Sequence, residues 1–445
     1  MKLFGTDGIR GRAGSPPLEP ETVARVGAAL ARAAAARGAA LSRVLVGRDT
    51  RESGPWIEAE LARGLASHGA RVTSAGVIPT PAVAYLTRAL GFDAGIVISA
   101  SHNPYEDNGI KVFSGAGEKL SEALEASVEA AVADPAWSIP PGAHADIEPA
   151  DLRRPYEDHL ERILADAGPL TGSRIVIDCA NGATTTIAPE LFAELGFDVV
   201  PVAVEPNGRN INLDCGSTHL GGLRDAVRVR NARLGVAFDG DGDRALLVDH
   251  RGEVVDGDAL LFITGLQLKA EGRLPGDAIV ATVMSNIGLE LALKARGIAL
   301  VRCPVGDKYV MEEMQRRGLA LGGEQSGHVI FADHLSTGDG IGTALQALRV
   351  MAVTGRELAD LSAELVTYPQ VLVNVRVKAR TDFRANPAIA DAIARLESRL
   401  DGHGRLLVRY SGTEPLLRIM LEGRDQQEIQ AWARELADTV KAHLG

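Results

Sequence analysis

Short runs of aliphatic and β-branched residues alternate with longer helical stretches over the first 368 positions of the chain. A first set of strands is expected at 44–46, near 72 and at 95–99, with helices at 53–68 and 82–90. A second set is expected at 175–177, 199–204 and 235–238, with a helix at 186–195. A third set is expected at 279–283, 299–302 and 319–321, with helices at 289–296 and 310–317. Strands that alternate with helices are typical of α/β domains with mainly parallel sheets.

The pattern changes after Tyr368. Valines at 371, 373, 375 and 377 alternate with other residues, which predicts a half-exposed antiparallel strand. A helix at 386–400, strands at 406–410 and 417–422 and a final helix at 427–443 complete a small α+β domain. We therefore expect three similar α/β domains with mixed, mainly parallel sheets, followed by this α+β domain. The expected boundaries are 1–150, 151–254, 255–367 and 368–445.

Composition and charge narrow the class of protein. A chain of 445 residues is long enough for about two to four domains. Its net charge of −11 argues against a nucleic-acid partner, because a phosphate backbone requires a basic face. The three cysteines are far apart and form no CxxC pair, so we expect a cytoplasmic protein without disulfides. The first residues lack the apolar core of a signal peptide, and arginines interrupt the Ala-rich helix expected at 26–41, so we expect no membrane segment.

Polar loops follow the closing strand of each predicted α/β set. They read SASHNP at 99–104, DGDGDR at 239–244 and GEQSGH at 323–328. Ligands of open α/β sheets gather beyond the carboxyl ends of the strands. We therefore expect the three loops to converge on one cleft.

The first loop places Ser101 just beyond a buried strand, on backbone that Pro104 stiffens. On local sequence alone, a turn with a capping serine is favoured over a catalytic role for this segment. A tight turn at 108–111 would bring the amine of Lys111 back toward the serine. His102 is not expected to be the base of Ser101 on adjacency alone, because neighbouring extended residues point apart.

The second loop carries carboxylates at alternate positions: Asp239, Asp241 and Asp243. Glycines between them let the backbone curl so that all three reach one point, which predicts a Mg²⁺ or Ca²⁺ site. An EF-hand is excluded, because Arg244 and His250 stand where it needs glycine and glutamate. An acidic surface turn is the alternative. Three carboxylates fill only half of an octahedral shell, so a phosphate oxygen is a natural further ligand.

Other polar segments suit a phosphorylated sugar. The carboxylate, amide, hydroxyl and imidazole of 324–328 match sugar hydroxyls, although glycine-serine turns are common. The segment 409–415, with Arg418 beyond it, offers backbone N–H groups, hydroxyls and two arginines to an anchored phosphate. Charged turns at 5–11, which contains Arg10, and at 47–51 add further arginines to such a cleft.

Together these segments resemble the α-D-phosphohexomutase superfamily along essentially the whole chain. The stretches that carry the resemblance are FGTDGIRG from Phe4, ISASHNPYEDNGIK from Ile98, DCANGA at 178–183, EQSGH at 324–328 and SGTEP at 411–415. The resemblance implies a TATA-binding-protein-like fourth domain, a covalent phosphate on Ser101 and one Mg²⁺ per chain. It implies as metal ligands Ser101 in its phosphorylated form, Asp239, Asp241 and Asp243. The implied catalytic set is Ser101, Lys111, Arg10, His102 and Arg244, with Arg10 and Lys111 as proton-transfer groups and Arg244 beside the transferring phosphate.

Within that superfamily the stretches are most similar to the members that act on hexosamine phosphates. This implies an isomerase that interconverts glucosamine 6-phosphate and glucosamine 1-phosphate through a bisphosphate and so feeds UDP-N-acetylglucosamine and cell-wall precursor synthesis. The implied partners are the hexosamine phosphate and its bisphosphate, and a homodimer is allowed. The implied substrate-binding residues are Glu324, Ser326, His328, Arg409, Ser411, Gly412, Thr413 and Arg418.

Three alternatives stay open at this stage: the same chemistry on glucose or mannose phosphates, a Mg²⁺-dependent sugar phosphatase, and a sugar-phosphate-binding module. One residue departs from the family pattern. Lys308 stands where arginine is expected, and an ammonium cannot make the bidentate contacts of a guanidinium. A role for this residue in binding phosphate or sugar is therefore in doubt.

Overall fold

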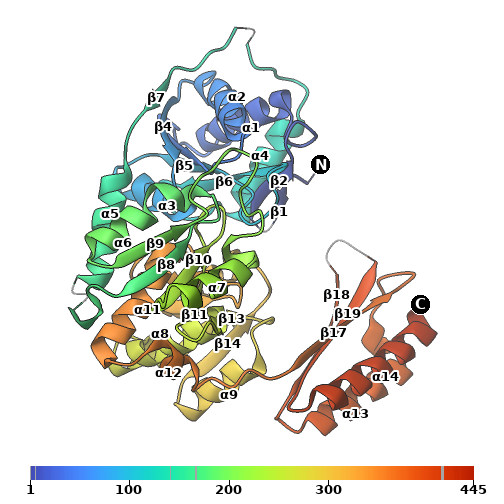
Figure 1. Cartoon of the computed structure of the whole chain (residues 1–445). Helices are drawn as coiled ribbons and strands as arrows, with labels where there is room; N and C mark the ends of the chain where they lie inside the picture. Colours follow the sequence, from blue (N-terminus) through green and yellow to red (C-terminus); the bar gives the residue numbers. More distant parts are fainter. Residues whose placement is uncertain (1, 6, 141, 166–167, 412–414) are drawn as a thin grey trace. The chain divides into compact units, whose positions relative to one another are not determined.

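The computed structural model describes residues 2–5, 7–140, 142–165, 168–411 and 415–445. The chain divides into two compact bodies (Figure 1). The first comprises Met1–Met284 and Ile298–Ala363, and the second comprises Ser285–Gly297 and Glu364–Gly445. The first body contains three mixed sheets covered by helices, and the second contains one small antiparallel sheet.

The three sheets of the first body share one topology. In each, a central strand lies between two parallel neighbours that follow it in the chain, and an antiparallel strand follows the second of these neighbours. We call the parts of the chain around these sheets the first, second and third α/β modules. Their strands are, in this order, β3 (Arg43–Arg48), β4 (Arg71–Val77), β5 (Ala94–Ile98) and β6 (Asp107–Ser114); β8 (Arg174–Asp178), β9 (Asp198–Val202), β10 (Leu234–Phe238) and β11 (Ala245–Asp249); and β13 (Ala278–Thr282), β14 (Ala299–Cys303), β15 (Leu321–Gly323) and β16 (Val329–Phe331).

Short additional strands widen two of these sheets: β1 (Phe4–Gly5), β2 (Gly8–Arg12) and β7 (Ile147–Pro149) in the first, and β12 (Val254–Val255) in the second. The helices from the first module to the end of the third are α1 (Pro20–Ala35), α2 (Gly54–Ala66), α3 (Thr80–Ala89), α4 (Glu122–Ala133), α5 (Arg153–Glu161), α6 (Ala188–Glu194), α7 (Gly221–Val229), α8 (Gly257–Ala270), α9 (Ile287–Ala295), α10 (Asp307–Arg317), α11 (Gly340–Thr354) and α12 (Leu358–Ser362). The expected fold class, three similar α/β domains with mainly parallel strands, is confirmed.

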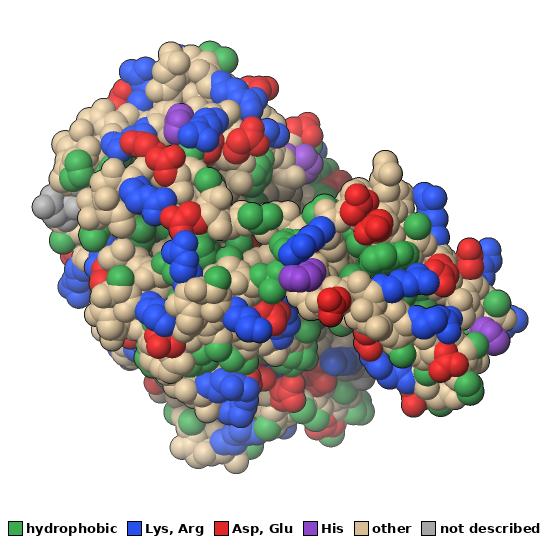
Figure 2. Space-filling view, turned by 90° about the horizontal axis from the view of Figure 1, so that it is seen from below, with side chains coloured by type: hydrophobic (Ala, Val, Ile, Leu, Met, Phe, Trp, Pro, Cys, Tyr) green, Lys and Arg blue, Asp and Glu red, His purple; other side chains and the backbone are tan. Residues whose placement is uncertain are grey.

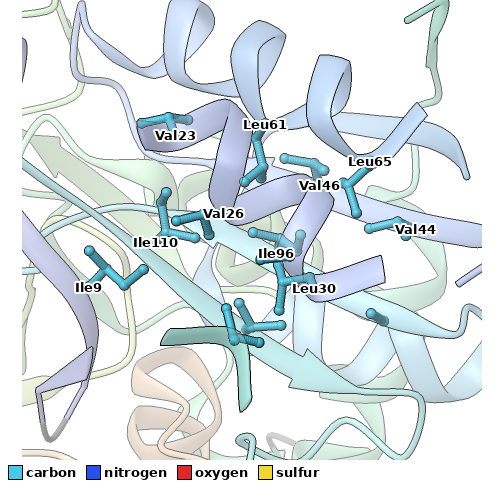
Figure 3. Packing of buried hydrophobic residues seen from close by; sticks show 14 of the residues in the cluster. Ile9, Val23, Val26, Leu30, Val44, Val46, Leu61, Leu65, Ile96 and Ile110 are labelled. Atoms are coloured by element: carbon cyan, nitrogen blue, oxygen red, sulfur yellow. The ribbon is translucent and has the colours of Figure 1, made fainter. Parts of the chain in front are cut away.

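Aliphatic side chains build the core of the first module. Helices α1 and α2 pack over the sheet, and their inward faces meet the side chains of β3, β5 and β6 (Figure 3). The side chains that meet there include Val23, Val26, Leu30, Leu61 and Leu65 from the helices and Val44, Val46, Ile96 and Ile110 from the strands. Burying such a layer holds the carboxyl end of β5, and with it the loop that contains Ser101, on a rigid support.

The second body is a three-stranded antiparallel sheet with helices on one face. Its elements are α9, which lies between β13 and β14 in the chain, and then β17 (Gln370–Arg376), α13 (Pro387–Leu400), β18 (Arg405–Tyr410), β19 (Leu416–Glu422) and α14 (Gln426–Leu444), with the strand order β17-β19-β18. Alternate residues of β17 and β19 pack against α13 and α14, as the valine alternation predicts. This confirms the small α+β domain at the end of the chain.

Local details differ from the sequence-based expectation. The Ala-rich helix α1 begins at Pro20 and ends at Ala35 instead of spanning 26–41. The segment 108–111 is not a tight turn but the start of β6, which pairs antiparallel with β5. Strand β15 lies at Leu321–Gly323, two residues after the expected 319–321. The domain boundaries at 150, 254 and 367 stay a proposal.

The surface carries charges of both signs. On the face drawn in Figure 2, lysine and arginine side chains are interspersed with aspartate and glutamate. Among the described residues, no helix combines the length and the apolar character that crossing a membrane requires.

Candidate active site

Ser101 lies in the loop between β5 and β6 in an unusual backbone conformation. Its φ of 54° is left-handed, which costs a non-glycine residue free energy unless the surroundings hold it in place. Its N–H donates to Ser99 Oγ at 2.9 Å, and Ser99 Oγ in turn donates to Asp49 Oδ2 at 2.6 Å. Ser101 Oγ is thereby aimed at the second module, where it donates to Asp239 Oδ2 at 2.5 Å.

Arg51 is the buried support of this loop. Its guanidinium pairs with Asp49 at 2.8 Å and donates to the carbonyl oxygens of Ser101 at 3.0 Å and Asn103 at 2.8 Å. It also donates to the carbonyl oxygens of Pro104 and Asp107. The interpretation of 47–51 as a charged turn facing the cleft is therefore wrong, because Asp49 and Arg51 are buried and hold the serine loop from behind.

Replacing Arg51 by methionine is expected to lower the free energy of unfolding by about 3–5 kcal/mol, because the buried Asp49 carboxylate loses its partner. Urea unfolding followed by circular dichroism measures this loss. Arg316→Met is the control, since Arg316 is exposed and pairs with Glu313 on the same helix, so its loss should cost about 0–1 kcal/mol. Equal stability of the two variants would contradict the supporting role of Arg51.

The loop after β10 brings three carboxylates together. One ligand oxygen from each of Asp239, Asp241 and Asp243 lies within 4.8 Å of the others, and all three residues are buried. Within the described part of the chain, Asp241 Oδ1 and Asp243 Oδ1 are buried and accept no hydrogen bond. Buried carboxylate oxygens without donors are costly unless a cation binds them. The three residues therefore fit a divalent cation, whereas an exposed acidic turn does not describe them.

Burial and the neighbouring charged groups shift the pKa values of the carboxyl groups in this cluster in opposite directions. Burial, Asp243 and Asp241 together hold the pKa of Asp239 well above its ordinary value. Burial opposes ionisation of Asp243, but Lys111 and His328 nevertheless lower its pKa to about 2. Lys111 Nζ lies 2.9 Å from Asp241 Oδ2 and 3.0 Å from Asp243 Oδ2. Although burial lowers the pKa of Lys111, these carboxylates raise it well above its ordinary value, so the residue is an ammonium.

Segments from all three α/β modules fix the backbone of the aspartate loop. The N–H of Thr80, at the start of α3, donates to Asp241 O at 2.8 Å, and the N–H of Gly340, at the start of α11, donates to Gly242 O at 2.9 Å. A Cβ atom at Gly240 would lie 2.6 Å from Ser101 O, so only glycine allows the serine loop to approach this closely. The serine and aspartate loops are thus locked against each other.

A cavity of about 370 Å³ opens beside the two loops. It is lined by parts of the first, second and third modules: Leu3, Gly5, Asp7, Gly8, Arg10, Asp243, Arg244, Val305, Gly306, Asp307, Glu324 and His328. Its size suits one phosphorylated hexose. Residues of the second and third polar loops line this cavity, and the first loop adjoins it through the contact of Ser101 with Asp239.

Arg10, Arg244 and His102 surround the serine. Arg10 Nη2 pairs with Asp7 Oδ2 at 2.5 Å, and the N–H of Arg244 donates to Asp239 Oδ1 at 3.2 Å. His102 Nδ1 lies 3.4 Å from Ser101 Oγ, closer than an extended backbone would allow, because Ser101 is left-handed. Burial, with help from Arg244 and Arg10, lowers the pKa of His102 to about 4, so its imidazole is neutral near pH 7.

The third loop adds the polar groups expected for a sugar. Glu324 Oε1 accepts from the N–H of Gly306 at 3.2 Å, and Ser326 Oγ is buried without a hydrogen-bond partner among the described residues. His328 is buried, with Nε2 at 3.4 Å from Asp307 Oδ2. Lys308 points elsewhere: its Nζ pairs with Glu125 of α4 at 3.1 Å, which explains how a lysine serves at this position.

The predicted phosphate anchor lies in the second body. Arg409 of β18 and Arg418 of β19 are direct cross-strand partners, on the sheet face opposite the helices. Burial and the neighbouring Arg418 charge lower the pKa of Arg409, which is the electrostatic signature of a site that favours an anion. Ser411 donates its N–H to Leu416 O at 2.8 Å and so closes the hairpin. Gly412 and Thr413 lie outside the described residues.

Sequence reasoning missed several residues that hold this site together. Asp7 pairs with both Arg10 and Lys111, and its Oδ2 lies 3.0 Å from Lys111 Nζ. The sequence alone assigns this residue no role of its own within the glycine-rich turn. Asn212 donates to the carbonyl oxygens of Ser101 and Asn103 from the second module. Lys119 and Asp307 meet between the first and third modules. Asp7 lies in the FGTDGIRG stretch, but its contacts, like those of the other three residues, become visible only in the fold.

Four consecutive regions of the sequence match the domains of one family: phosphoglucomutase/phosphomannomutase alpha/beta/alpha domain I at residues 1–137, domain II at 154–252, domain III at 256–368 and the C-terminal domain at 372–439. The chain therefore belongs to the phosphoglucomutase/phosphomannomutase family.

Individual relatives narrow this class. The phosphoglucosamine mutase of Solibacter usitatus is 51% identical over 445 residues, covering 100% of this chain and 99% of the relative. That of Alkalilimnicola ehrlichii is 49% identical over 443 residues, covering 99% and 97%. A phosphoglucomutase/phosphomannomutase family protein of Burkholderia thailandensis has the same fold, with a TM-score of 0.81, 24% identity and coverage of 99% and 97%. N-acetylphosphoglucosamine mutase of Aspergillus fumigatus, solved with GlcNAc-6P and magnesium, matches with a TM-score of 0.70, 19% identity and coverage of 99% and 95%.

Proposed function

We propose that this protein is a phosphoglucosamine mutase, an isomerase that interconverts glucosamine 6-phosphate and glucosamine 1-phosphate. The observation that carries the proposal is the 2.5 Å contact of the buried Ser101 Oγ with Asp239, at the edge of a three-carboxylate cluster and beside a sugar-sized cavity. The full-length similarity to phosphoglucosamine mutases supports the substrate.

Phosphorylated Ser101 is the proposed phosphoryl donor. A free sugar hydroxyl attacks the phosphorus, the bond from phosphorus to Ser101 Oγ breaks, and a hexosamine bisphosphate forms. Lys111 and Arg10, which both carry protons, supply the proton that the leaving Oγ requires, and the attacking hydroxyl returns one to them. The bisphosphate then turns over in the cavity, and Ser101 Oγ takes the other phosphoryl group by the reverse steps.

Asp239, Asp241 and Asp243 are the proposed ligands of one Mg²⁺, together with an oxygen of the phosphate on Ser101. The ion, when bound, would offset negative charge on the phosphoryl group. Arg244 lies against the same carboxylates and offers its guanidinium to that group. Glu324, Ser326 and His328 would bind the sugar, and Arg409, Ser411 and Arg418 would bind the phosphate that is not reacting.

The substrate assignment is tested by incubating the protein, primed with hexose bisphosphate and Mg²⁺, with the 6-phosphates of glucosamine, glucose and mannose. Phosphorus NMR then follows formation of each 1-phosphate. We expect glucosamine 6-phosphate to be preferred by at least about tenfold in kcat/KM, a discrimination worth about 1.4 kcal/mol. A tenfold preference for glucose or mannose would overturn the assignment, and release of inorganic phosphate as the main product would favour a phosphatase.

We also propose that the enzyme works in the reducing cytoplasm. Cys179, Cys215 and Cys303 are free, buried thiols. This agrees with a protein that needs no disulfide for its stability.

A further inference from the structure

Lys119 bridges two carboxylates from different modules. It lies in the first module, after β6, and its Nζ is 2.6 Å from Asp7 Oδ1. The same ammonium pairs with Asp307 at the start of α10, in the third module. All three side chains are largely buried, with 10–20% of each exposed. One cation therefore ties the first module to the third within the first body.

Each of the two carboxylates also lies next to a side chain that lines the cavity. Asp7 Oδ2 binds Arg10 at 2.5 Å and Lys111 at 3.0 Å. Asp307 Oδ2 lies 3.4 Å from His328 Nε2. Lys119 itself reaches Asp7 and Asp307 from a separate groove of about 220 Å³. Among the described residues, Lys119 does not line the cavity, but it contacts Asp7 and Asp307, which do.

Electrostatics make this ammonium hard to replace. Burial opposes ionisation of Asp307, but Lys119 lowers the pKa of that carboxyl, so both Asp7 and Asp307 are ionised. Without Lys119, Asp7 would keep Arg10 and Lys111, but the two largely buried carboxylates of Asp7 and Asp307 would lose the ammonium that bridges them. Their repulsion in a region of low dielectric would push the two cavity walls apart.

We propose that Lys119 is a positioning residue of the phosphoryl transfer. Its ammonium bridges Asp7 and Asp307 and so fixes the relative positions of Arg10, from the first module, and His328, from the third, in the lining of one cavity. This inference rests on the proposed function, because it needs a reaction whose rate reports the placement of Arg10. It makes Lys119 important for turnover although it need not touch the substrate.

Lys308 provides a matched control in the same region. It too is a largely buried lysine that joins the third module to the first, through Glu125 of α4 at 3.1 Å. Among the described residues it lines the separate groove and not the cavity. Lys308→Met therefore removes an ion pair between the same two modules without removing a partner of Asp7.

The test compares steady-state kinetics of Lys119→Met and Lys308→Met with glucosamine 6-phosphate. We expect kcat of Lys119→Met to fall about 30–100-fold with KM changed less than about fivefold, since a displacement of about 1 Å costs about a hundredfold. Lys308→Met should keep kcat within about threefold of the wild type. If both variants lose kcat equally, or neither does, the positioning role is overturned, while turnover by the wild type in the same assay leaves the proposed function standing.

Two further variants separate charge from packing. Lys119→Arg keeps a bridging cation and should retain kcat within about fivefold of the wild type, whereas a packing role would make the bulkier arginine as harmful as methionine. In the Lys119→Met background, Asp307→Asn removes the repulsion and should restore kcat by at least about fivefold, as coupled residues do. A double variant no faster than Lys119→Met would overturn the bridge. Lys119→Arg also provides the comparison if Lys119→Met unfolds below the assay temperature.

Discussion

Ser101→Ala should lose mutase activity by at least about 10⁴-fold, the scale on which a covalent enzyme depends on its nucleophile. Ser101 Oγ is held 2.5 Å from Asp239 by a left-handed backbone that Arg51 and Asn212 fix from two modules. The nearby Ser99 Oγ donates to Asp49 and accepts the Ser101 N–H, so it points away from the aspartate cluster. The Thr80 hydroxyl does reach the cluster, but it donates to Asp241 Oδ2 at 2.6 Å and not to Asp239.

The measurement has two parts, turnover of glucosamine 6-phosphate and intact mass after incubation with hexose bisphosphate. The wild type should gain the mass of one phosphate, and Ser101→Ala should gain none. Ser127→Ala is the control, because Ser127 lies on α4, where its Oγ donates to Ala123 O. Phosphate on Ser101→Ala, or activity within tenfold of the wild type, would contradict covalent catalysis at this residue.

Much of the fold follows from local pattern. Each predicted set of strands in the first 368 residues is present, because short β-branched runs buried on both sides leave few other structures open to the chain. The antiparallel partners β6, β11 and β16 were missed. Strand β6 begins with a mixture of polar residues and glycine, Asn108-Gly-Ile-Lys111, and β16 has only three residues, so neither shows a clear strand pattern. Strand β11, with the sequence ALLVD, is an apolar run that the prediction passed over.

The sequence predicted the loops of the candidate site but not the contacts between the side chains of different modules. The aspartate spacing pointed to a cation site before any fold was known, and the three carboxylates do converge. The sequence could not reveal that Lys111 lies on Asp241 and Asp243, because their separation of about 130 residues is closed only by the contact of two modules. The turn that contains Arg51 was expected to face the cleft for the same reason: burial depends on tertiary contacts that local pattern does not contain.

Asp239→Asn is expected to separate stability from activity. Burial and two neighbouring carboxylates raise the pKa of Asp239 far above its ordinary value, so the ionised form near pH 7 costs the metal-free protein stability. Asparagine removes that charge but keeps an oxygen that can accept from Ser101 Oγ. The metal-free variant should therefore melt at the same temperature as the wild type or higher. Its turnover should nevertheless fall about 10²–10³-fold, the usual loss when charge stabilisation at a reacting group is removed.

Thermal melting with and without Mg²⁺ gives a readout that does not depend on turnover. At a Mg²⁺ concentration about 100 times its Kd, the wild type should gain about 2.7 kcal/mol of stability, and Asp239→Asn should gain much less. Asp158→Asn is the control, because Asp158 is half exposed and pairs with Arg154 on α5. Lys111 contacts Asp241 and Asp243 but not Asp239, so among the three carboxyl groups Asp239 receives the least stabilisation of its ionised form from that ammonium. If Asp239→Asn melts lower than the wild type without Mg²⁺ and gains as much on adding it, the three carboxylates are a structural cluster and not a metal site.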